Sequence, residues 1–120
     1  MLKKLSLFLV AASMLLGFGS AAIATELIVS FQSAYPGPVN LSFYSDTYKN
    51  REWPGDGQVY ILDDYAVYDY NLACEPGEQI SFGAWANNRP STYWGSGDGT
   101  YACDNCVFTC GESYITQTLE

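Results

Sequence analysis

Histidine is absent from all 120 residues, and its absence excludes several classes of active site at once. Histidine is the usual general base near neutral pH and the commonest protein ligand of transition metals. Ser-His-Asp and Cys-His nucleophile systems are therefore excluded, and so are zinc hydrolase sites built on histidine. We expect a protein that is not an enzyme and that uses no cofactor and no metal.

Basic residues are also scarce, with 5 Lys and Arg against 13 Asp and Glu. Lys3 and Lys4 belong to an N-terminal segment that we expect to be removed, which leaves Lys49, Arg51 and Arg89 and a net charge near −10. Such a surface repels nucleic acid and anionic membranes, so neither is an expected partner. A basic protein or a cation is electrostatically favoured. The simpler alternative is that the charge only maintains solubility.

Long apolar runs are lacking except at residues 5–18, directly after Lys3 and Lys4. This run is too short for a membrane span, which needs roughly 20 apolar residues. Small residues follow it and end in Ala22-Ile23-Ala24, a typical signal-peptidase site. The order predicts a cleaved signal peptide over residues 1–24, a mature N-terminus at Thr25, and a periplasmic or extracellular location.

Helical periodicity is missing from residues 25–120, which are long enough for one domain with a modest core. Short alternating segments appear instead, separated by Gly, Pro, Asn and Asp. They predict an all-β protein, a small antiparallel sandwich or barrel of seven to eight short strands stabilised by disulfides. The expected strands cover residues 26–32, 39–45, 58–62, 65–73, 79–86, 92–95, 107–110 and 114–119, with a polar loop at 46–57.

Four cysteines follow the predicted cleavage site: Cys74, Cys103, Cys106 and Cys110. Export to an oxidising compartment favours two disulfides. Every complete pairing joins Cys74 to one of the other three, which closes a loop of about 30–37 residues and stabilises by roughly 3–4 kcal/mol. Two alternatives are a four-cysteine metal site and a redox-active Cys103-x-x-Cys106 pair.

Three segments of the second half, residues 74–85 (CEPGEQISFGAW), 93–97 (YWGSG) and 103–111 (CDNCVFTCG), carry a resemblance. They are similar to a group of small exported bacterial proteins with C-x-P-G-E-x-I-C-x-G-A-W, W-G-x-G and C-x2-C-C-x2-C motifs. The resemblance implies export and fold and assigns no activity. Ser81 and Val107 stand where the group's pattern has cysteines, which implies that these two residues are neighbours.

Two polar features have candidate roles besides structural ones. The glycine-rich residues 94–99 resemble a phosphate cradle but lack a lysine and a helix start, which favours a hairpin loop. Carboxylates gather at Asp63, Asp64 and Asp69 and again at Asp98 and Asp104. They fit calcium or a glycosidase pair by chemistry, although acidic turns explain them equally, and calcium binding stays open.

Aromatic side chains are the best candidates for ligand contact, with Trp53, Tyr93 and Trp94 forming the predicted ligand-binding set. Trp85 alternates with Phe82 and Ala84 and is a further candidate. Core packing is the alternative for each of them. Trp53 lies in a Pro- and Gly-rich segment and is the expected exposed anchor.

Two functions of different classes follow from these observations. One is a non-catalytic binding module for envelope or extracellular carbohydrate, using Trp53, Tyr93 and Trp94. The other is an acidic protein-interaction domain, for instance a periplasmic inhibitor of a basic hydrolase such as lysozyme, using loop carboxylates.

The protein recovered from the periplasm or the medium should begin at Thr25. The reason is the order of charged, apolar and small residues at the N-terminus. Mass spectrometry of the exported protein checks the prediction, and an intact Met1 would contradict it.

Overall fold

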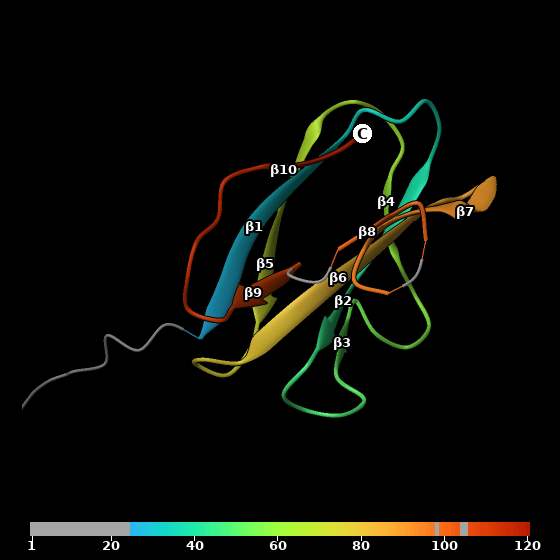
Figure 1. The fold of residues 1–120 in the computed structure, drawn as a ribbon. Helices are drawn as coiled ribbons and strands as arrows, with labels where there is room; N and C mark the ends of the chain where they lie inside the picture. Colours follow the sequence, from blue (N-terminus) through green and yellow to red (C-terminus); the bar gives the residue numbers. More distant parts are fainter. Residues whose placement is uncertain (1–24, 98, 104–105) are drawn as a thin grey trace, which may run out of the picture.

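The computed structural model describes residues 25–97, 99–103 and 106–120, and the predicted signal peptide lies outside this part of the chain. The described residues form ten β-strands and no helix (Figure 1). The strands are β1 (Glu26–Ser33), β2 (Val39–Ser45), β3 (Glu52–Trp53), β4 (Tyr60–Leu62), β5 (Val67–Ala73), β6 (Gln79–Ala86), β7 (Arg89–Gly95), β8 (Tyr101–Ala102), β9 (Val107–Thr109) and β10 (Gln117–Leu119).

The strands make two sheets that face each other. The small sheet has the order β10-β1-β5, and the large sheet has the order β3-β2-β6-β7-β8, with β4 also paired to β2 and β9 to β6. Figure 1 shows β1, β5 and β10 on one side of the molecule and β2, β6 and β7 crossing on the other. The predicted all-β sandwich is confirmed.

Alternation along the long strands builds the core between the sheets. β1 buries every second residue, and β2 and β6 present alternate apolar residues to the same interior. Phe31 of β1 lies at the centre, with its ring edge-on to Phe43, Phe82 and Phe108. The core therefore depends on aromatic contacts between the two sheets.

Several local predictions need correction. The predicted loop 46–57 contains β3, and the expected connection between the strands at 79–86 and 92–95 is a two-residue turn, because β7 begins at Arg89. Ten strands replace the seven to eight expected, since β3 and β8 have two residues each and carry no detectable alternation. Two pairings are parallel, β1 with β10 and β7 with β8, although an antiparallel sandwich was predicted.

All four cysteines are paired, as Cys74–Cys110 and Cys103–Cys106. Cys74 follows β5 of the small sheet and Cys110 follows β9 of the large sheet, so their disulfide joins the two layers. The predicted bond from Cys74 to the C-terminal cluster is confirmed, and the four-cysteine metal site is not formed. These bonds indicate an oxidising compartment outside the cytoplasm.

Ser81 of β6 lies directly opposite Val107 of β9 in the antiparallel register. The predicted neighbourhood of these two residues is confirmed.

Replacing Cys74 and Cys110 together by Ser should lower the free energy of unfolding by about 4 kcal/mol. The reason is the sequence separation of 36, which makes the bond a strong constraint on the unfolded chain. The matched Cys103→Ser, Cys106→Ser variant loses a bond of separation 3, worth about 2 kcal/mol. Urea denaturation measures both, and equal losses would contradict the prediction.

Candidate functional site

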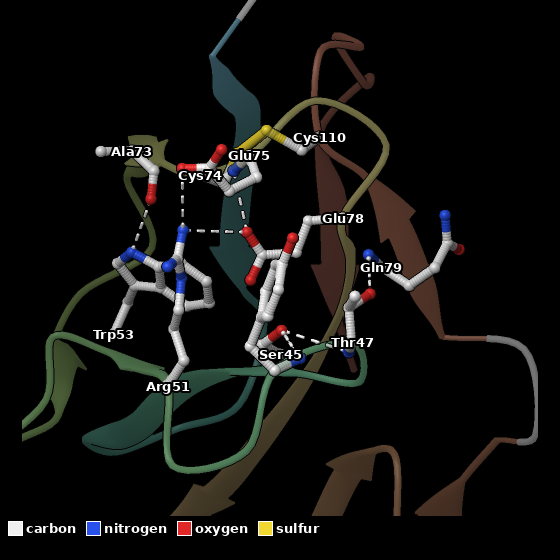
Figure 2. A network of polar contacts seen from close by, with 11 residues as sticks. Ser45, Thr47, Arg51, Trp53, Ala73, Cys74, Glu75, Glu78, Gln79 and Cys110 are labelled. Carbon is white, nitrogen blue, oxygen red and sulfur yellow. Dashed lines mark hydrogen bonds and ion pairs between the residues drawn. A yellow bond between two sulfur atoms is a disulfide. The ribbon is translucent and has the colours of Figure 1, made fainter.

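Trp53 does not stand free of the body of the protein. It lies in β3 opposite Phe43 and is partly buried against the core. Its Nε1 donates a hydrogen bond of 3.1 Å to the carbonyl of Ala73, at the end of β5 (Figure 2). Trp53 therefore links the large sheet to the small sheet, and this structural role was not visible in its polar sequence neighbours.

The guanidinium group of Arg51 lies over the ring of Trp53. Its guanidinium carbon lies 5.8 Å from the centre of the Trp53 ring and 5.2 Å from that of Tyr48. One guanidinium nitrogen lies 3.1 Å from Oε1 of Glu78 and 3.9 Å from a carboxylate oxygen of Glu75 (Figure 2). The Glu78 side chain is 0% exposed, so Arg51 neutralises a fully buried carboxylate. We assign Arg51 and Trp53 to structure.

An open concavity of about 740 Å³ lies beside this network. It is lined by the residues of two loops, Tyr48–Glu52 and Pro54–Gly57, and includes two of the domain's three basic residues, Lys49 and Arg51. Arg51 is already paired with Glu78, so Lys49 is the single basic group there without an assigned ion pair among the described residues.

Tyr93 and Trp94 are neighbours in β7 and point to opposite faces of the large sheet. Trp94 is 5% exposed and packs in the core, where its Nε1 donates to the carbonyl of Glu120 at 2.9 Å. It also stacks on Tyr101, and both line a pocket of about 250 Å³. Trp53, Tyr93 and Trp94 thus form no common platform. Alternation puts Tyr93 and Trp94 on opposite faces, and Trp53 lies on β3, three strands away from β7 in the sheet.

The outer face of the large sheet carries a different aromatic group. Tyr44 of β2, Trp85 of β6 and Tyr93 of β7 lie on three adjacent strands, and we call them the aromatic strip. Trp85 pairs with Tyr93 in register, and Tyr44 is 37% exposed. Gly83 forms the floor, since a Cβ there would lie 2.5 Å from the Tyr93 hydroxyl and 3.4 Å from the Tyr44 ring.

The loop after β7 fixes the Tyr93 ring on the sheet. The Tyr93 hydroxyl donates to the carbonyl of Ser96, and Gly97 and Gly99 pack against the ring. Burial, and then the nearby Tyr44 hydroxyl, raise the pKa of Tyr93 above its usual value, so the phenol is a neutral hydrogen-bond donor at neutral pH. The described residues of the predicted glycine-rich loop therefore hold the Tyr93 ring in place. Asp98 of this loop lies outside the described residues.

Polar groups accompany the strip. Asn40 of β2 is opposite Trp85 in register, and no described residue makes a hydrogen bond to its buried Oδ1. Ser42 of the same strand lies between Asn40 and Tyr44 and is opposite Gly83. Sequence reasoning named Tyr93 and Trp85 but missed Tyr44 and Asn40, although alternation along residues 39–45 places both outward.

The acidic cluster at Asp63, Asp64 and Asp69 surrounds the start of β5. The Tyr68 hydroxyl donates to Asp64 at 2.9 Å and to Asp63 at 3.3 Å, and Ser30 donates to Asp69 at 2.6 Å. The hydrogen bond to Asp64, with desolvation and the charges of Asp64 and Asp63, raises the pKa of Tyr68 to about 12. This turn is a region of concentrated negative charge.

The chemistry of the other candidates is limited. Within the described ranges, no group of three or more acidic or cysteine side chains is arranged to hold a metal ion. Asp98 and Asp104, which were candidates for oxygen ligands, lie outside the described residues.

Replacing Trp53 by Ala should lower the free energy of unfolding by about 3 kcal/mol, because it removes a partly buried ring between Arg51 and the core. The conservative variant Trp53→Phe keeps the ring contact and loses the hydrogen bond to Ala73, which costs about 1 kcal/mol. Urea denaturation of both variants checks this. An unchanged free energy for Trp53→Ala would return the residue to the ligand-binding candidates.

No protein-family model, no curated protein and no solved structure matches this chain. None of the described residues belongs to a helix long and apolar enough to cross a membrane. The geometry of the site is therefore the basis for the function proposed below.

Proposed function

We propose that the protein is an exported, non-catalytic module that binds carbohydrate through the aromatic strip. The observation that carries the proposal is the position of Tyr44, Trp85 and Tyr93 on three adjacent strands of one sheet face. Flat aromatic rings stack against the apolar faces of sugars, and their hydroxyl and indole groups bind sugar hydroxyls. The predicted signal peptide and the disulfides support a periplasmic or extracellular site of action.

The strip is a compact aromatic surface. Tyr44 is opposite Ser81 and Tyr93 is opposite Trp85, four residues further along β6, yet the two tyrosine side chains converge above Gly83. The backbones of β2 and β6 are paired on both sides, which makes the face rigid. A rigid aromatic surface loses little conformational entropy on binding.

Asn40 supports the same ligand class. Its Oδ1 accepts no hydrogen bond from a described residue, so an added donor would relieve an unsatisfied polar atom. A sugar hydroxyl is such a donor, and Asn40 lies beside Trp85 on the same face. Because Oδ1 is buried, a sugar hydroxyl would reach it only after the amide rotates toward solvent.

A second candidate function is contact with a basic protein, such as a hydrolase that an acidic inhibitor would block. It is favoured by the turn between β4 and β5, where Asp63 and Asp64 precede Tyr65, a side chain that is 61% exposed. Carboxylates around an exposed tyrosine are suited to a basic cleft.

Isothermal titration of the exported protein with cello- and chito-oligosaccharides tests the first proposal. Tyr44→Ala and Trp85→Ala should each weaken binding at least about tenfold, because each removes a stacking surface. Tyr65→Ala is the matched control, since it removes an exposed ring from the turn before β5, where the carbonyl of Tyr65 accepts a hydrogen bond from Gln32 of the small sheet. Binding that is insensitive to both strip variants would contradict the proposal, as would absence of binding to every glycan.

A further inference from the structure

The edge of the small sheet formed by β5 is open. β5 pairs with β1 along Val67–Ala73, and no other described strand pairs with it. An unpaired strand edge presents backbone donors and acceptors to any extended chain that approaches it. β5 is seven residues long, which is enough to accept a further strand.

The backbone hydrogen bonds of β1 and β5 identify which backbone groups face the open side. The amide of Cys74 donates to the carbonyl of Thr25, so these two residues are a hydrogen-bonded pair across β5 and β1. Such pairs alternate with pairs whose backbone groups point away. On β1 the backbone groups that point away from β5 already have partners. The amide of Ile28 donates to the carbonyl of Glu112, and its carbonyl accepts from the amide of Tyr114.

The same alternation points the backbone groups of Val67, Asp69, Asn71 and Ala73 away from β1. The carbonyl of Ala73 confirms this direction, because it accepts the hydrogen bond from Trp53. Trp53 therefore closes one end of the edge. No described residue bonds to the outward backbone groups of Val67, Asp69 and Asn71.

The charge beside this edge selects its partner. Asp63 and Asp64 precede the strand and Asp69 projects from it, whereas Arg51, at the Trp53 end of the edge, is already paired with Glu78. Val67 adds an apolar surface that is 49% exposed. If two copies paired antiparallel through residues 67–71, Asp69 of one strand would lie opposite Asp69 of the other, and like charges in opposite positions disfavour such a pair.

We propose that β5 binds an extended, basic segment of a partner protein as an additional strand of the small sheet. The inference rests on the second candidate function, contact with a basic protein, and specifies its mode. Backbone hydrogen bonds to residues 67–71 supply the affinity, and alternating basic side chains contact the carboxylates around the strand.

Fluorescence anisotropy with a labelled, end-capped seven-residue peptide of alternating Lys and Val tests this mode on the exported protein. The matched Glu and Val peptide should not bind. Two N-methylated forms of the basic peptide, one methylated at every Lys and one at every Val, have the same charge. Only one set of amides faces β5, so one form should bind at least about tenfold more weakly than the other.

On the protein, Asn71→Pro should also weaken binding at least about tenfold, since it removes an outward amide that β1 does not use. Asn71→Ala keeps that amide and should bind like the parent. If Asn71→Pro does not fold, as judged by circular dichroism, the two methylated peptides decide the question on the parent protein.

The results separate this inference from the function on which it rests. Equal binding of both methylated peptides would overturn strand addition and leave charge attraction alone. Binding of folded lysozyme without binding of the peptide would support a basic partner and overturn the edge mode. Self-association abolished by Asn71→Pro would identify a second copy as the occupant and overturn the basic segment. Binding of no basic probe would overturn both proposals.

Discussion

The buried carboxylate of Glu78 is the constraint on which this end of the molecule depends. Its side chain is 0% exposed, and Oε1 accepts hydrogen bonds from Arg51 at 3.1 Å and from the amide of Glu75 at 2.9 Å. A buried carboxylate that loses its partner is strongly unfavourable, so Arg51 is required there. Arg51 lies in the loop between β2 and β3, so its ion pair with Glu78 holds that loop in place.

That loop then determines the surroundings of Trp53. Arg51 lies over the indole ring, and the indole nitrogen reaches across to Ala73 of the small sheet (Figure 2). The turn that carries Glu78 is held further by the amide of Cys110, which donates to the carbonyl of Glu78. Ion pair, indole and disulfide thus join the two sheets at one end, which is why a tryptophan in a polar segment is not a free ligand anchor.

Sequence alone was sufficient for the long strands and insufficient for contacts between distant segments. Alternation of Leu27, Val29 and Phe31 marks one buried face. The four cysteines can all pair only if Cys74 bonds to one of the C-terminal three. By contrast, β3 and β8 have two residues each, which is too short for a period to appear. Their existence depends on partners elsewhere in the chain.

For the candidate site, too, the sequence was sufficient for alternation within a strand and insufficient for the register between strands. Alternation was enough to place Trp85 on the face opposite Phe82 and Ala84, but not to show that this face is the outer one. Alternation also separates Tyr93 from Trp94, although the two were grouped as one ligand set. Which of them faces solvent depends on the register of β7 with β6, where Trp85 is opposite Tyr93 and Ala84 is opposite Trp94. Propensity cannot supply that register, because a shift of one residue exchanges the two faces.

The two proposed binding surfaces use different parts of the strands. The aromatic strip presents side chains from strands whose backbones are paired, whereas the edge of β5 presents backbone groups beside Asp69. The charge of the domain, near −10 after removal of residues 1–24, acts on both. Under the two proposals, this charge would attract a basic segment to β5 and would repel acidic polysaccharides, but not neutral glycans, from the strip. The same excess of carboxylates is therefore compatible with both proposals, provided that the sugar is neutral and the protein partner is basic.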